Sequence, residues 1–170
     1  MGTVGSGVFL SSNNGTSWSP VNSGLTTSGL DITSLAINGT NIFAGTNGSG
    51  VFLSTNNGSS WTAVNSGLTT SWIKSLIVNG TSVFAGTDEG VFLSTNNGTS
   101  WTAKNSGLPD YRIVKSFVVN GTDIFAGVDG AGVFRSTNSG TSWTAVNTGL
   151  SDLSIQTLAI SGTNIFAGTN

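Results

Sequence analysis

The side chains that could do chemistry are few in this chain of 170 residues, and most of them fall in short connecting segments. The chain has no His and no Cys, which excludes histidine bases, disulfides and Cys/His metal sites. Five basic and seven acidic side chains remain, with one Tyr and five Trp. These types suit recognition of a ligand by charge, hydrogen bonding and aromatic contact. The candidate ligand-binding residues are Trp72, Lys74, Asp88, Glu89, Asp110, Tyr111, Arg112, Lys115 and Asp129.

Catalysis is not predicted for these residues. A glycosidase places two carboxylates across a cleft, whereas Asp88 and Glu89 are sequence neighbours that would point apart on a strand. No Asp-x-Asp-x-Asp spacing indicates a calcium loop. No predicted helix follows a Gly cluster to form a phosphate-binding loop. We therefore expect no enzyme activity, no metal and no cofactor.

The composition narrows the possible partners and the location. A formal charge of -2 with only five Lys or Arg leaves no basic patch for nucleic acid. No apolar run approaches the roughly 20 residues of a membrane span, and no secretory signal pattern opens the sequence. A composition rich in Ser, Thr, Asn and Gly, with 7% charged residues, favours a secreted or extracellular location.

The elements that must position the candidates repeat along the whole chain. Gly39, Gly80, Gly121 and Gly162 are spaced 41 residues apart. Apolar runs bounded by Gly and Asn predict four strands in each unit, which we name A to D. In one unit they are A at Ile32–Asn38, B at Asn41–Thr46, C at Gly50–Thr55 and D at about Trp61–Asn65. Asn38-Gly39 predicts a type I′ turn between A and B, and no helix is expected anywhere.

Four short antiparallel strands repeated near 41 residues predict an all-β fold, a β-propeller of four-stranded blades. A β-solenoid is the alternative, but its coils are usually shorter and parallel. The predicted domain covers residues 2–170. Complete blades are expected at about 32–68, 73–108 and 114–150, strands C and D of a shared blade at 2–25, and its strands A and B at 155–170.

One motif in the predicted turn between C and D resembles the Asp-box, or BNR repeat, of sialidases, sortilin-type receptors and photosystem assembly factors. The family motif is Ser-x-Asp-x-Gly-x-x-Trp, and this chain has Asn in place of Asp in all four copies. The resemblance implies a propeller fold and a structural motif, with the Asn side chain capping its own turn and the Trp packed between blades. The matching residues are Ser11, Asn13, Gly15, Trp18, Ser54, Asn56, Gly58, Trp61, Ser94, Asn96, Gly98, Trp101, Ser136, Asn138, Gly140 and Trp143.

The resemblance does not extend to sialidase activity. Sialidases need three Arg, a Tyr nucleophile and a carboxylate pair, whereas this chain has only Arg112, Arg135 and Tyr111.

The two rims of the predicted propeller differ in how much their loop sequences change from one repeat unit to the next. Because the strands alternate in direction, the A–B and C–D turns share one rim, which we call the constant rim because its sequence recurs in every unit. The B–C turns and D–A links share the other, which we call the variable rim, and all the candidate binding residues lie in or next to it. Varied loops on a rigid scaffold indicate a binding face, while neutral drift of exposed links is the plainer interpretation.

Three functions follow from this pattern. The first is a non-catalytic scaffold or recognition module that binds a protein or glycan through the variable rim. The second is a purely structural or engineered repeat fragment with no ligand. The third is a multivalent lectin with one site per blade.

The two partial blades also bear on assembly. Residues 2–8 match residues 45–51, so the first residues are expected to supply only strands C and D of the shared blade. The missing halves could join within one chain as a four-bladed ring, or between two chains as an eight-bladed homodimer. Strand faces rich in Gly, Ala and Ser are thin, and they suit the narrower space between neighbouring blades of a larger ring. This favours the homodimer.

Overall fold

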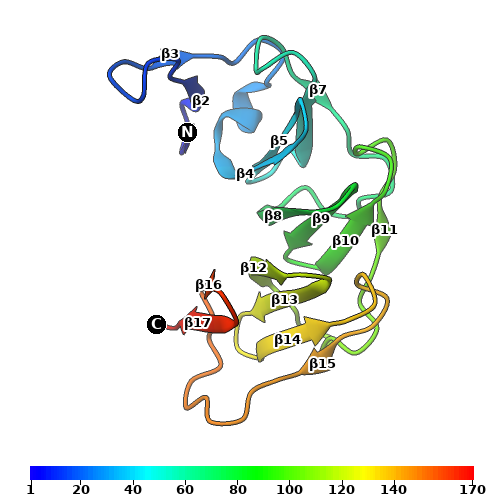
Figure 1. Cartoon of the computed structure of the whole chain (residues 1–170). Coiled ribbons are helices and arrows are strands. Elements are labelled where there is room, and N and C mark those ends of the chain that lie inside the picture. Colours follow the sequence, from blue (N-terminus) through cyan, green and yellow to red (C-terminus); the bar gives the residue numbers. More distant parts are fainter.

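The computed structural model describes all residues 1–170 as five antiparallel sheets that follow one another along an open, C-shaped arc (Figure 1). The three central sheets are four-stranded blades, each with its strands in chain order. The first strand of each blade lies on the inner side of the arc and the fourth on the outer side (Figure 1). The all-β propeller fold predicted from the sequence is confirmed.

The strand bounds follow the predicted repeat. Blade 1 contains β4 (Ile32–Asn38), β5 (Asn41–Thr46), β6 (Val51–Ser54) and β7 (Thr62–Ala63). Blade 2 contains β8 (Ile73–Asn79), β9 (Ser82–Thr87), β10 (Gly90–Ser94) and β11 (Thr102–Ala103). Blade 3 contains β12 (Val114–Asn120), β13 (Asp123–Val128), β14 (Gly132–Ser136) and β15 (Thr144–Ala145). The first half-blade contains β1 (Gly2–Thr3), β2 (Gly7–Leu10) and β3 (Ser19–Pro20), and the last contains β16 (Thr157–Ser161) and β17 (Asn164–Gly168).

Four local details differ from the predictions. Strand D is only two residues long in each blade. A 3-10 turn, η1 (Thr27–Leu30), forms in the first D–A link, where the Thr26 hydroxyl accepts a hydrogen bond from the Gly29 amide. The last strand A begins at Thr157 rather than at Ile155. The first half-blade has an extra strand, β1, because Gly2 and Thr3 match the end of a strand B and pair with β2.

The A–B turn also has a different type from the one predicted. Asn38 pairs with Asn41, so the two turn residues are Gly39 and Thr40. Only Gly39 has positive φ, at 62°, which is the pattern of a type II′ turn with Gly first. The prediction placed the turn one residue too early, because Asn-Gly is the commoner hairpin pair.

The C–D turn forms the hydrogen bonds expected of its motif. In blade 1 the Asn56 Oδ1 atom accepts from the Ser60 amide at 2.9 Å and from the Ser54 hydroxyl at 2.9 Å. The Ser54 Oγ atom accepts from the Gly58 amide at 2.8 Å. Equivalent bonds recur in the other three turns. The turn therefore satisfies its own backbone donors without help from the rest of the chain.

The core lies between the blades. The Trp of each complete blade is buried against the preceding blade, and its indole donates to a backbone carbonyl there, from Trp61 to Val21, Trp101 to Val64 and Trp143 to Lys104, at 2.7 to 2.8 Å. Trp18 differs, since its sheet lies at one end of the arc and the side chain is 46% exposed. Packing between blades is thus shown for three of the four motif Trp residues.

The arc does not close on itself. The sheet of β1, β2 and β3 and the sheet of β16 and β17 share no strand pairing, and both termini lie on the open side of the arc (Figure 1). Of the two closures left open by the sequence, the single-chain four-bladed ring is not the arrangement seen here. The structure contains no helix long and apolar enough to cross a membrane.

Candidate functional site

The variable rim is held together by contacts between B–C turns and the D–A links beside them. Asn47 in the first B–C turn forms an isolated antiparallel β-bridge with Trp72 in the next D–A link. Asp88 in the second B–C turn accepts a 2.6 Å hydrogen bond from the Thr70 hydroxyl, and Glu89 accepts one from the Thr69 hydroxyl. Each candidate loop is therefore braced by another loop of the same rim.

The junction of blades 1 and 2 carries the first pair of candidates. Trp72 is 46% exposed, and the Lys74 ammonium lies 5.3 Å from the centroid of its ring, within cation–π range. The Lys74 Nζ atom also donates to the Asn47 side-chain oxygen at 3.2 Å. The indole keeps an exposed surface, while the ammonium is engaged with its neighbours.

Arg112, at the junction of blades 2 and 3, is engaged with the backbone. Its Nε donates to the Glu89 carbonyl at 3.0 Å, and its Nη1 donates to the carbonyls of Pro109 and Asp110 at 2.9 and 3.1 Å. The guanidinium thus ties the D–A link that carries Tyr111 to the second B–C turn. Arg112 therefore positions this link through its Nε and Nη1 atoms.

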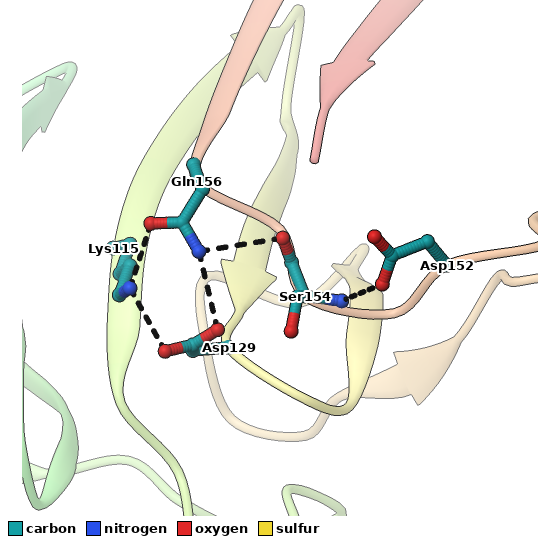
Figure 2. A network of polar contacts seen from close by, with 5 residues as sticks. All are labelled: Lys115, Asp129, Asp152, Ser154 and Gln156. Atoms are coloured by element: carbon teal, nitrogen blue, oxygen red, sulfur yellow. Dashed lines mark hydrogen bonds and ion pairs between the residues drawn. The ribbon is translucent and has the colours of Figure 1, made fainter. Parts of the chain in front are cut away.

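A polar network lies near the end of blade 3 (Figure 2). The Lys115 ammonium contacts the Asp129 carboxylate at 2.8 Å and donates to the Gln156 Oε1 atom at 2.7 Å. The Gln156 Nε2 atom donates to the other Asp129 oxygen at 3.3 Å and to the Ser154 carbonyl at 3.4 Å. Nearby, the Asp152 carboxylate accepts from the Ser154 amide at 2.9 Å. These contacts fix the third B–C turn against the last D–A link.

A hollow of about 400 Å³ opens beside this network. Tyr111 forms one wall and is 73% exposed, so its ring is available to a ligand. The third B–C turn also lines the hollow, and no internal hydrogen bond engages the Ser154 hydroxyl. The lining residues are Pro109, Tyr111, Asp129, Gly130, Ala131 and Ser154.

The structure brings only some of the sequence candidates together. Tyr111, Asp129 and Lys115 lie at or beside the hollow, whereas Trp72 and Lys74 belong to another junction. The Asp110 side chain is exposed and makes no hydrogen bond. Gln156 was missed, although it stands 41 residues after Lys115 in the same repeat position.

Several carboxylates of the variable rim are engaged in polar contacts within the chain. Asp88 and Glu89 each accept from a threonine hydroxyl, and Asp129 is paired with Lys115. The chain holds no group of three or more acidic side chains placed to bind a metal ion.

A family model matches the greater part of the chain, over residues 3–113. The chain belongs to the DUF6242 β-propeller domain family. No curated protein matches this DUF6242 chain.

Solved structures similar to this DUF6242 chain include GH74 enzymes, YCF48 and a designed protein. A GH74 enzyme from Niastella koreensis is 21% identical, with a TM-score of 0.72 over 94% of this chain and 29% of the enzyme. YCF48 bound to D1 peptide is 16% identical, with a TM-score of 0.66 over 84% of this chain and 49% of YCF48. The computationally designed Ika4 protein is 11% identical, with a TM-score of 0.62 over 81% of this chain and 84% of Ika4.

These similarities show the fold alone, because all three identities are low. The chain also spans only part of the natural propellers that it matches, for example 22% of the length of an ancestral GH74 enzyme.

Proposed function

We propose that this DUF6242 domain is a non-catalytic recognition module that binds its ligand through the variable rim, at the hollow between Tyr111 and the third B–C turn. The observation that carries the proposal is the combination of an exposed aromatic ring with a rigid polar wall. Tyr111 is open to solvent, while Asp129 in the same lining is fixed by Lys115 and Gln156. A fixed polar wall loses little conformational entropy on binding.

The hollow suits a flat ligand group with polar edges. A sugar ring or a planar peptide side chain could lie against the Tyr111 ring and reach the Ser154 hydroxyl. Structural neighbours include proteins of both kinds, since one is a xyloglucanase from Xanthomonas campestris and another is YCF48 bound to D1 peptide. Either a glycan or a protein segment is therefore compatible with the hollow.

The four C–D turns belong in this proposal as structural variants of the Asp-box. Their hydrogen bonds are internal to the turn, so they build the scaffold and leave the opposite rim free for binding.

Two other functions account less well for the variable rim. A lectin with one site per blade requires like groups at each junction, whereas Trp72 with Lys74, Arg112 with Glu89, and Tyr111 with Asp129 differ in kind. A purely structural repeat fragment does not explain why the largest hollow lies beside an exposed Tyr.

A glycan array and an immobilised peptide library, both probed with the labelled chain, test the proposal. We expect saturable binding to a defined glycan or peptide, loss of that binding in Tyr111→Ala, and retention in Trp72→Ala. Trp72 is the matched control because it is an exposed aromatic on the same rim at another junction. Absence of saturable binding on both supports, or binding that survives Tyr111→Ala, would contradict the proposal.

A further inference from the structure

We propose that two copies of this chain complete each other, with β17 of one copy pairing with β2 of the second at both ends, to form a closed eight-bladed ring. Each copy holds three complete blades and two partial ones. Two copies therefore give six complete blades and two composite blades, eight in total, within the range known for propellers. The inference does not depend on the proposed ligand site.

The contact between successive blades is the same at each junction inside the chain. The amide nitrogen of each buried motif Trp donates to a carbonyl of the preceding blade, from Trp61 to Ser23, Trp101 to Ser66 and Trp143 to Ser106, at 2.8 to 2.9 Å. A Gly follows each accepting residue and lies against the Trp backbone. A Cβ added at Gly24, Gly67 or Gly107 would come within 2.1 to 2.2 Å of the Trp carbonyl oxygen.

The two ends of the arc hold complementary halves of this contact. At the last complete blade, Val146 and Thr148 stand at the repeat positions whose backbone carbonyls accept hydrogen bonds from a Trp in the earlier blades. Gly149 stands at the position of the glycines that lie against a Trp backbone, but it has open space around it. At the first half-blade, Trp18 is exposed, and neither its amide nor its indole nitrogen donates within the chain. Trp18 of a second copy fits this place.

The two ends of the arc also hold a second pair of complementary features, an exposed side chain on β17 and an apolar hollow at the first half-blade. Phe166 in β17 is 59% exposed, whereas the equivalent Phe43 and Phe84 are fully buried. At the other end of the arc, an apolar hollow of about 160 Å³ opens between the first half-blade and blade 1. Its lining includes Val8, Leu10, Val21, Ile37, Ile42 and Trp61.

This apolar hollow has the composition of the site that buries Phe43. Phe43 packs in a cluster with Val51, Val83 and Trp101 and the partly buried Val64. Val8, Ile42, Trp61 and Val21 occupy the corresponding repeat positions in the apolar hollow. We infer that Phe166 of a second copy fills it as Phe43 fills its own site.

The strand register fits the same arrangement. In blade 1, Phe43 pairs with Leu53 and Gly45 with Val51. The same register places Phe166 opposite Leu10 of the second copy. In the free chain, β1 occupies part of this edge, because Gly2 pairs with Val8. β1 therefore holds the place of a strand B and must leave when β17 of the second copy arrives.

A second copy is favoured over closure within one chain because the junctions are uniform. All three internal junctions repeat the same Trp contacts at nearly equal distances. Closing four blades on themselves would require each junction to tilt further and lose these contacts. A second copy closes the ring with the junctions unchanged, and it pairs the unpaired edge of β17, a kind of edge that proteins otherwise protect, with the edge of β2 that β1 covers in the free chain.

Light scattering on the 170-residue chain is the first test. We expect a mass of about 34 kDa, twice the 17.2 kDa of one chain. Phe166→Ser and Trp18→Ala should each weaken the dimer about tenfold or more, since each removes a large apolar group from the interface. Tyr111→Ser, which changes an exposed aromatic outside the interface, should leave the mass unchanged. A mass of one chain at all concentrations, or of more than two chains, would overturn the proposal.

Cross-linking identifies which copy supplies the strand. The chain has no Cys, so Leu10→Cys and Phe166→Cys introduce the only thiols, and directly opposed positions of paired strands lie close enough for a disulfide. When the two single variants are mixed and oxidised, we expect a product of two chains that reduction separates. Phe166→Cys mixed with Tyr111→Cys is the matched control and should not cross-link. If the double variant of Leu10 and Phe166 forms its disulfide within one chain, closure is internal and the proposal is wrong.

Discussion

The indole nitrogen of Trp61 donates a 2.7 Å hydrogen bond to the carbonyl of Val21, which lies in the preceding blade. The same relationship joins Trp101 to Val64. One side chain per unit thus fills the space between two blades and also donates to a backbone carbonyl of the preceding blade. The arc is a series of equal junctions, and its stability depends on them.

Trp61→Ala should lower the free energy of unfolding by about 3–5 kcal/mol, because it removes a buried aromatic and leaves a cavity between blades. Urea unfolding followed by circular dichroism measures the change. Trp72→Ala is the matched control, since Trp72 is half-exposed and its replacement should cost much less. Equal stability of the two variants would contradict the junction described here.

Gly107→Ala and Gly149→Ala separate backbone strain from packing. Both positions have φ near +88°, so an added Cβ strains each by a similar amount, about 1 kcal/mol. Only at Gly107 would it also strike the Trp143 carbonyl oxygen. We expect Gly107→Ala to unfold at markedly lower urea concentration than Gly149→Ala. If the second copy packs as proposed, Gly149→Ala should fold but dissociate to single chains, which light scattering detects.

Asn56→Ala should destabilise the chain by about 1 kcal/mol, because two donors of the turn lose the Asn56 oxygen. Asn56→Asp keeps that acceptor and loses only the bond from Nδ2 to the Ser60 hydroxyl, so it should be closer to wild type. Urea unfolding of both variants checks the order. A smaller loss in Asn56→Ala than in Asn56→Asp would contradict the capping role.

Arg112→Ala should cost about 1 kcal/mol of stability and also weaken ligand binding, because three backbone carbonyls of the rim lose a donor. Arg112→Lys keeps the charge but cannot reproduce this fork of donors, so it should restore little. Urea unfolding and the binding assay on the same variants test this. Full recovery in Arg112→Lys would mean that the charge itself contacts the ligand.

The parts of the fold that the sequence predicts best are those set by local pattern. Strands A and B of blade 1 have the predicted bounds, because Asn38-Gly39 ends the first apolar run and Asn47-Gly48 follows the second. The 3-10 turn at Thr27–Leu30 lacks such a pattern and depends on one capping hydroxyl. The site was harder to predict, because Gln156 and Ser154 acquire their roles only when two blades bring distant loops together. The exposure of Trp18 likewise follows from its place in the arc, since its motif is the same as the others.

The recognition site at Tyr111 is tested most directly by nuclear magnetic resonance of the 15N-labelled chain, titrated with a glycan or peptide selected on the arrays. We predict that the amide signals of Tyr111, Gly130 and Ser154 shift in a saturable way, and that those of Asn57 and Gly98 on the constant rim do not move. Saturable shifts confined to the constant rim, with Tyr111 and Gly130 unchanged, would contradict the assignment of ligand recognition to the variable rim.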